Sequence, residues 1–194
     1  MPDQVPKSEN AFQMTPEEIK LHLEDLYSYA RPRILDQLHR DEVLTNTFST
    51  ALQTDSSGED SAKHDAAWLI GILRKQIFAH YQRKYRPEEA IAKARQSAKE
   101  ILNREFDIPE KHFGLGASVL SQSDNQSFWS AFNECIEMLD EVHSEVFILR
   151  DLEDVSVEEV CGVFSLIRSD VLELIYRARM TLIACLAKNL ESGD

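Results

Sequence analysis

Basic and polar side chains cluster between positions 74 and 84 of the 194-residue chain. They occupy the second half of a predicted helix at 65–85, whose first half is almost entirely apolar. Lysine and arginine bind phosphate oxygens through charge and hydrogen bonds, so the pattern predicts a surface for a polyanion. A solvated basic helix face is the simpler alternative. The residues of this surface are Arg74, Lys75, His80, Gln82, Arg83 and Lys84.

Charge is distributed unevenly along the chain. The net charge of the whole chain is −13, which argues against a protein that coats nucleic acid without specificity. Residues 74–104 contain nine basic and three acidic side chains, a net charge of +6. Residues 128–194 contain five basic and fourteen acidic side chains, a net charge of −9. The first segment suits a polyanion, and the C-terminal third does not.

Side chains for catalysis or metal binding are scattered. The six histidines show no HExxH or other paired ligand spacing, and no nucleophile, phosphate loop or cofactor motif is present. We therefore expect no enzyme, no cofactor and no metal site. The cysteines Cys135, Cys161 and Cys185 are far apart and form no CxxC pair, which predicts reduced thiols. With no signal peptide and no long apolar run, we expect a cytoplasmic protein without membrane insertion.

Helical periodicity fills the chain, and strand-like alternation is absent. The first helix is predicted to begin with a capping box between Thr15 and Glu18. The other predicted helices lie at 41–52, 65–85, 86–106 and, as two helices, 128–152. The sequence thus predicts an all-α protein of two small domains. Its predicted parts are a tail (1–14), a first domain (15–106), a linker (107–127) and a second domain (128–190).

Two helices with a tight turn are predicted after Val155. Ser156 caps the first of them, and Glu159 completes a capping box. In the second helix, Ser169 is the nearest residue able to act as a cap. The layout fits a helix-turn-helix, whose second helix enters the major groove of DNA, although any αα-hairpin produces the same pattern. The apolar residues of the second helix are Val171, Leu174, Ile175, Ala178 and Leu182.

Two parts of the sequence resemble extracytoplasmic-function (ECF) sigma factors. The segments "DEVLTNTFSTAL" (41–52) and "AWLIGILRKQIFAHYQRK" (67–84) are similar to the family's "EDLVQETFLRAL" and "AWLFGILRNVIIDHYRRK" helices. Further along, "EVFILRDL", "SVEEV" and "RARMTL" are similar to the "VF.L.E", "S..EI" and "RAR..L" elements of the family's C-terminal DNA-binding domain. The similar parts occur in the family's order and cover most of residues 20–188.

The resemblance implies three binding surfaces. Core RNA polymerase would be bound by Asp41, Glu42, Leu44, Thr45 and Phe48. The −10 element of promoter DNA would be bound by the basic set at 74–84. The −35 element would be bound by Arg168, Ser169, Asp170, Glu173, Tyr176 and Arg177. The resemblance also implies an anti-sigma factor as a partner.

The helix assigned to the −35 element departs from the family. Asp170 and Glu173 face phosphates or bases on this hypothesis, and repulsion and desolvation both oppose that. Leu172 stands where Lys or Arg is common. One interpretation is a sigma factor that directs promoter-specific initiation. The alternative is a sigma-like regulatory protein whose acidic C-terminal domain binds a protein partner instead. A helical adaptor outside transcription is a third hypothesis.

Overall fold

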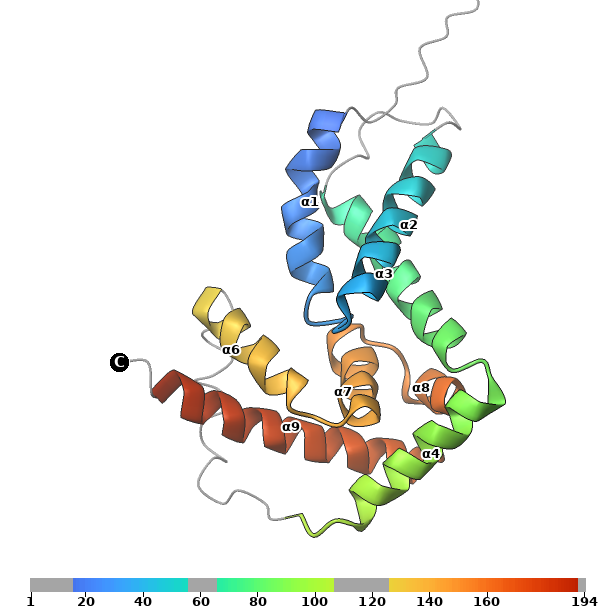
Figure 1. The fold of residues 1–194 in the computed structure, drawn as a ribbon, viewed down its shortest axis with the longest axis vertical. Helices are drawn as coiled ribbons and strands as arrows, with labels where there is room; N and C mark the ends of the chain where they lie inside the picture. The colour runs from blue at the N-terminus through green and yellow to red at the C-terminus, as the bar shows by residue number, and fades with distance from the viewer. Residues whose placement is uncertain (1–15, 56–65, 107–125, 192–194) are drawn as a thin grey trace, which may run out of the picture.

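The computed structural model describes residues 16–55, 66–106 and 126–191, and all secondary structure in these ranges is helical (Figure 1). The predicted all-α class is confirmed. The predicted cap at Thr15, the tail and nearly all of the linker lie outside the described residues. In chain order the elements are α1 (Pro16–Ala30), α2 (Gln37–Asp55), α3 (Ala66–Lys84), α4 (Glu88–Asn103), α6 (Gln126–Glu137), α7 (Glu141–Phe147), the π-helical turn η2 (Ile148–Leu152), α8 (Val157–Phe164) and α9 (Arg168–Glu191).

Helices α1, α2 and α3 form the first half of the molecule and pack on one another, and the second half consists of α4, α6, α7, η2, α8 and α9. The apolar half of α3 lies against α1 and α2, as its sequence predicts, and this leaves the basic half free to extend toward the second half of the molecule. The fully buried side chains of this bundle include Leu26, Val43, Leu69, Leu73 and Ile77.

Helix α2 begins at Gln37, upstream of the predicted start at Asp41. The Asp36 carboxylate accepts a hydrogen bond from the backbone N–H of His39, with an N–O distance of 2.9 Å. An aspartate in this position satisfies an otherwise unpaired donor of the first helical turn. The predicted start was therefore wrong because the capping role of Asp36 was not predicted.

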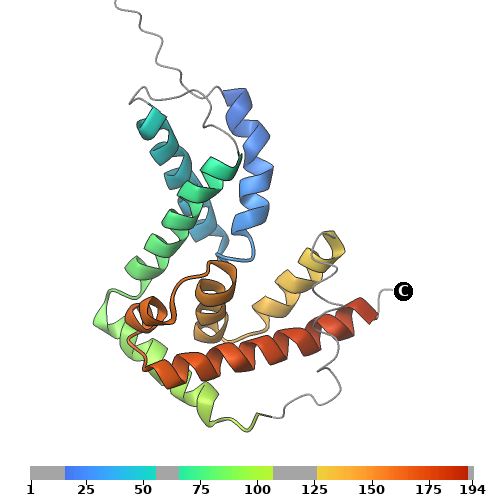
Figure 2. The ribbon, with the colours of Figure 1, turned by 180° about the vertical axis from the view of Figure 1, so that it is seen from behind.

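Helix α4 leaves the first half of the molecule. It packs against α7, α8 and α9, and both ribbon views show it crossing the beginning of α9 (Figure 2). Ala94, Ala98 and Ile101 form its buried face. The predicted domain boundary at 107–127 stays a prediction, and the contacts of α4 tie the segment before it to the helices after it.

The capping box at the start of α8 is confirmed. The backbone N–H of Glu159 donates to the Ser156 hydroxyl at 3.2 Å, and the Glu159 carboxylate accepts from the Ser156 N–H at 3.2 Å. The helix ends at Phe164, and Ser165 follows with φ 50° and ψ 42°. A left-handed conformation of this kind ends a helix and favours glycine, so serine is strained there.

Helix α9 begins at Arg168, after the turn Ser165–Ile167. The predicted cap at Ser169 is wrong. The carbonyl of Ile167 already accepts hydrogen bonds from the N–H groups of Asp170 and Val171, at 3.1 and 3.2 Å, so the helix starts upstream of that serine. The predicted apolar stripe of α9 is buried, and it comprises Val171, Leu174, Ile175, Ala178 and Leu182.

Buried apolar side chains from both halves of the molecule belong to one continuous cluster. Tyr85, just after α3, contacts Phe164 of α8 with 4.5 Å between the ring centroids. Aromatic rings in contact at this distance bury a large apolar area. The two halves thus meet through packed side chains as well as through charges.

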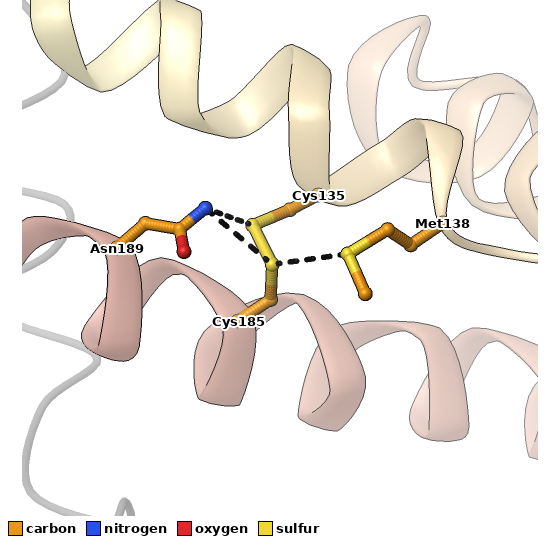
Figure 3. The surroundings of a disulfide bond; sticks show 4 residues. All are labelled: Cys135, Met138, Cys185 and Asn189. Carbon is orange, nitrogen blue, oxygen red and sulfur yellow. Dashed lines mark hydrogen bonds between the residues drawn. A yellow bond between two sulfur atoms is a disulfide. The ribbon is translucent and has the colours of Figure 1, made fainter.

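A disulfide joins α6 to α9 (Figure 3). Cys135 and Cys185 are separated by 50 positions in the sequence, and the Cα atoms are 5.8 Å apart because the two helices pack side by side. The prediction of reduced thiols is therefore wrong for this pair, and Cys161 is free. Cysteine spacing alone carried no signal of the pairing, since only helix packing brings the two residues together.

Removal of this crosslink is expected to destabilise the second half of the molecule. Crosslinks that close loops of this size restrict the unfolded chain and contribute about 2–4 kcal/mol to the free energy of unfolding. The double variant Cys135→Ser/Cys185→Ser should lose this amount in urea unfolding, and Cys161→Ser is the matched control. An unfolding midpoint of the wild-type protein that does not respond to a reducing agent contradicts the prediction.

Candidate nucleic-acid interface

A shallow groove lies between α1 and α2. Four of the five residues predicted to bind polymerase line it, together with Leu23 and Tyr27 of α1. The four are Asp41, Leu44, Thr45 and Phe48. The Glu42 side chain is exposed but does not line the groove.

The side chains of the groove divide into a floor and a rim. Leu44 is buried and Phe48 half-buried, so both belong to the packing between helices as well as to the groove. Asp41 and Thr45 are exposed, and the Thr45 hydroxyl donates to the Asp41 carbonyl at 2.8 Å. An apolar floor with an acidic and polar rim is the composition expected of a protein-binding surface.

The predicted basic face of α3 is only partly open to solvent. Arg74, Lys75, Gln82 and Arg83 are exposed. Arg74 and Lys84 form ion pairs with acidic residues of the second half of the molecule. The set predicted at 74–84 therefore does not present one continuous basic surface in this arrangement.

Arg74 is bound to Glu153, which follows η2. The Arg74 Nε donates to the Glu153 carboxylate at 3.3 Å, and its Nη2 donates to the Glu153 carbonyl at 2.6 Å. The same carboxylate accepts from the Nε of Arg33 at 2.5 Å and from the Tyr29 hydroxyl at 3.0 Å. Only 2% of the Glu153 side chain is exposed. The sequence did not predict a buried ion pair for Glu153. The segment "RDLED" contains three neighbouring acidic residues, and nothing in the sequence distinguishes one of them from the others.

Lys84 lies between two carboxylates of α7. Its ammonium group is 2.6 Å from Glu141 and 2.6 Å from Glu145, and Glu145 also accepts a hydrogen bond from Tyr85. Burial raises the pKa of the Glu145 carboxyl, whereas the hydrogen bond from Lys84 lowers the pKa of Glu141. Burial opposes the charge of Lys84, but the two carboxylates outweigh it and raise the lysine pKa.

His80 is buried, with 8% of the residue exposed, and its ring lies 5.0 Å from the ring of His39. Burial lowers the pKa of His80 to about 4, and the neighbouring groups His39, Lys84 and Arg83 act in the same direction. Glu42 opposes them weakly. At neutral pH the imidazole is uncharged and adds nothing to the positive charge of α3.

The residues predicted to bind the −35 element lie on the first turns of α9. Arg168, Ser169 and Tyr176 are exposed, and Asp170 is half-buried. Arg168 is paired with Glu158 of α8. The structure thus places this set on one helix beside α8 and leaves several members open to solvent. Glu173 and Arg177 form an ion pair with each other.

Arg177 is held by α4. Its Nη1 donates to the carbonyls of Ile101 and Arg104, at 2.9 and 3.0 Å, and its Nε donates to Glu173 at 2.7 Å. Only 13% of the Arg177 side chain is exposed. Carbonyls at the end of a helix carry partial negative charge and are suitable partners for a guanidinium. In this arrangement Arg177 is not available to a phosphate.

The described residues form neither a candidate metal site nor a membrane-spanning helix. Within 16–55, 66–106 and 126–191, no group of three or more His, Cys, Asp or Glu side chains has a geometry that could hold a metal ion. In the same ranges no helix combines the length and apolar character needed to span a membrane.

Comparison with known proteins gives one informative similarity. No protein-family model and no solved structure matches the chain. Over 128 residues the chain is 27% identical to a curated protein of Haemophilus influenzae named "Probable RNA polymerase sigma factor". The chain is thus similar to a sigma factor. The alignment covers 63% of this chain and spans 64% of the length of the relative.

The low pKa of His80 predicts a pH-dependent stability. In the unfolded chain His80 is protonated near pH 6.5, whereas in the folded chain it is protonated only near pH 4. The contribution of neutral His80 to the free energy of unfolding is therefore complete above about pH 6.5 and is lost as the pH falls toward 4. The loss should amount to about 2–3 kcal/mol. It is measured as the difference in unfolding free energy between wild type and His80→Gln at both ends of this range. Variant His22→Gln, on α1, is the control, and equal pH profiles for wild type and His80→Gln contradict the prediction.

Proposed function

We propose that the protein is a sigma factor of the ECF type, which binds core RNA polymerase and directs it to specific promoters. The observation that carries this proposal is the groove between α1 and α2, because four residues predicted from sequence to bind polymerase line this one surface. The similarity to a protein named as a sigma factor supports the same function. The function requires no catalytic residue, and it places the protein in the cytoplasm with the polymerase and with an anti-sigma factor.

The three surfaces divide the task of initiation. The groove provides an apolar floor and an acidic rim for the polymerase. The basic face of α3 supplies Lys75 and Arg83, with Arg74 and Lys84 once they are released, to hold the phosphates of a separating duplex at the −10 element. Helices α8 and α9 supply a helix-turn-helix for the −35 element, with Arg168 and Tyr176 exposed toward solvent.

A second candidate function rests on the exposed surface at the start of α9. Ile167 and Leu172 are 65% and 45% exposed, next to Asp170 and Glu173. A surface of apolar and acidic side chains suits a protein partner better than a phosphate backbone. On this hypothesis the protein is a sigma-like regulator that binds polymerase and uses its acidic C-terminal half to bind another protein.

Transcription in vitro with core polymerase and genomic promoter fragments tests the proposed function. We expect promoter-specific transcripts with the wild-type protein. Thr45→Arg places a cation on the acidic rim of the groove and should reduce affinity for core polymerase about tenfold, which corresponds to about 1.4 kcal/mol, because an acidic rim suits a basic partner that the new cation repels. Asn46→Arg, one position outside the groove, is the matched control. Core binding without a specific transcript favours the second candidate, and no core binding refutes both.

The start of α9 offers a separate test of DNA binding. Asp170→Asn/Glu173→Lys removes two acids, adds one cation and frees Arg177 from its ion pair with Glu173. If this helix faces DNA, the variant bound to polymerase should have a higher affinity for promoter DNA and a salt dependence steeper by about one to two phosphate contacts. Glu134→Gln/Glu137→Lys on α6 makes the same change of charge as a control. Equal salt slopes for the two variants mean that α9 does not face DNA.

A further inference from the structure

The two helices α8 and α9 lack the positive charge that a DNA duplex demands. Residues 157–177, which comprise α8, the turn and the start of α9, contain two basic and four acidic side chains, a net charge of −2. The two basic side chains, Arg168 and Arg177, are both paired with glutamates. Phosphate contacts supply much of the affinity of a protein for DNA. This segment therefore needs cations from another element if it binds a duplex.

Helix α4 lies beside this segment and carries suitable charge. Arg95, Lys99 and Asn103 follow one another at intervals of four residues, which places them on one face of the helix. Together with the turn before α9, they line an open groove that also includes Asp170 of the first turn of α9. Both ribbon views show α4 crossing the beginning of α9 at this place (Figures 1 and 2).

The two cations of this groove have no acidic partner within the part of the chain that the structure describes. Arg95 and Lys99 are exposed, and neither forms an ion pair with a described carboxylate. The other basic residues of the same stretch, Lys93 and Arg104, each pair with a carboxylate at 140–141. The charge of Arg95 and Lys99 is therefore available to an anion from outside the chain.

Hydrogen bonds at both ends hold α4 in place beside α9. The Nε of Arg95 donates to the Ser165 carbonyl in the turn before α9, at 2.8 Å. Near the other end of α4, the Nη1 of Arg177 donates to the carbonyls of Ile101 and Arg104. The position of the two cations relative to the start of α9 is thus set before any ligand binds, which reduces the entropy lost on binding.

We propose that α4 is part of the DNA-binding surface, and that Arg95 and Lys99 bind the phosphate backbone beside the start of α9. In a helix-turn-helix the first residues of the second helix reach the base edges in the major groove, so an element beside them lies over a flanking strand. Asp170 in the same groove does not prevent this. Aspartate accepts a hydrogen bond from the cytosine amino group, and the two cations offset its repulsion of phosphate. The assignment of DNA as the ligand rests on the proposed function.

Loss of the Lys99 charge should weaken DNA binding. Lys99→Gln in the full chain should lower the affinity for a random-sequence DNA duplex about three- to tenfold at low ionic strength, because one phosphate contact is lost. The salt dependence of the affinity should become shallower by about one phosphate contact. Both quantities are measured by fluorescence anisotropy over a series of salt concentrations. Lys99→Arg keeps the charge and should keep the affinity and salt dependence of the wild type.

Lys93→Gln is the matched control. It removes the same charge from the same helix, but Lys93 is 81% exposed and lies 3.5 Å from Glu141 instead of lining the groove. This variant should keep the salt dependence of the wild type. Equal salt dependence for Lys99→Gln and Lys93→Gln overturns the proposal, as does a wild-type protein that binds no duplex. An acidic protein segment is then the ligand that fits the groove.

Transcription in vitro separates this inference from the proposed function. If Lys99→Gln directs promoter-specific transcripts at the wild-type level and its salt dependence is unchanged, the role of α4 is refuted and the proposed function stands. If Lys99→Gln shows the shallower salt dependence but the wild-type protein directs no promoter-specific transcript, the DNA-binding role of α4 is supported and the proposed function is refuted.

Discussion

The buried carboxylate of Glu153 is the most desolvated charged contact between the two halves of this molecule, beside the apolar cluster that they share. Glu153 has lost nearly all contact with water, and desolvation of a charge on that scale must be offset by partners of good geometry. Each partner comes from α1, from the loop after it or from α3, so none is available within the second half. Two guanidinium groups and one hydroxyl share this carboxylate, so the contact couples α1, the loop after it and α3 to the segment that follows η2. The pairs of Lys84 with Glu141 and Glu145 join α3 to α7 in addition.

The uneven charge of the chain has a structural explanation. The excess of basic groups at 74–104 and the excess of acids at 128–194 face each other, as in the pair of Lys84 with Glu145 between the halves and the pair of Arg104 with Asp140 at the end of α4. Complementary charge of this kind selects one relative orientation more than it adds stability. Acidic residues that suit DNA poorly are therefore well suited to the chain's own basic helices.

Local signals in the sequence predicted most of the helices. The capping box of Ser156 and Glu159 depends on residues three positions apart, and both the apolar half of α3 and the buried stripe of α9 depend on helical periodicity. The Asp36 cap of α2 was overlooked, and the predicted start of that helix was therefore placed too far along the chain. The all-α class followed from these patterns, because each of them involves neighbours along a single helix.

Contacts between distant segments were not predictable in the same way. Glu153 stands beside two other acids in sequence, and only the approach of Arg33 and Arg74 makes it different from them. The pairing of Cys135 with Cys185 likewise depends on how α6 lies on α9. The sequence by itself determined the helices, the apolar faces and the separation of charge, since these depend on residue types and short spacings. Tertiary structure alone decided which charges meet, because burial and partner geometry are properties of the packed halves and not of any single segment.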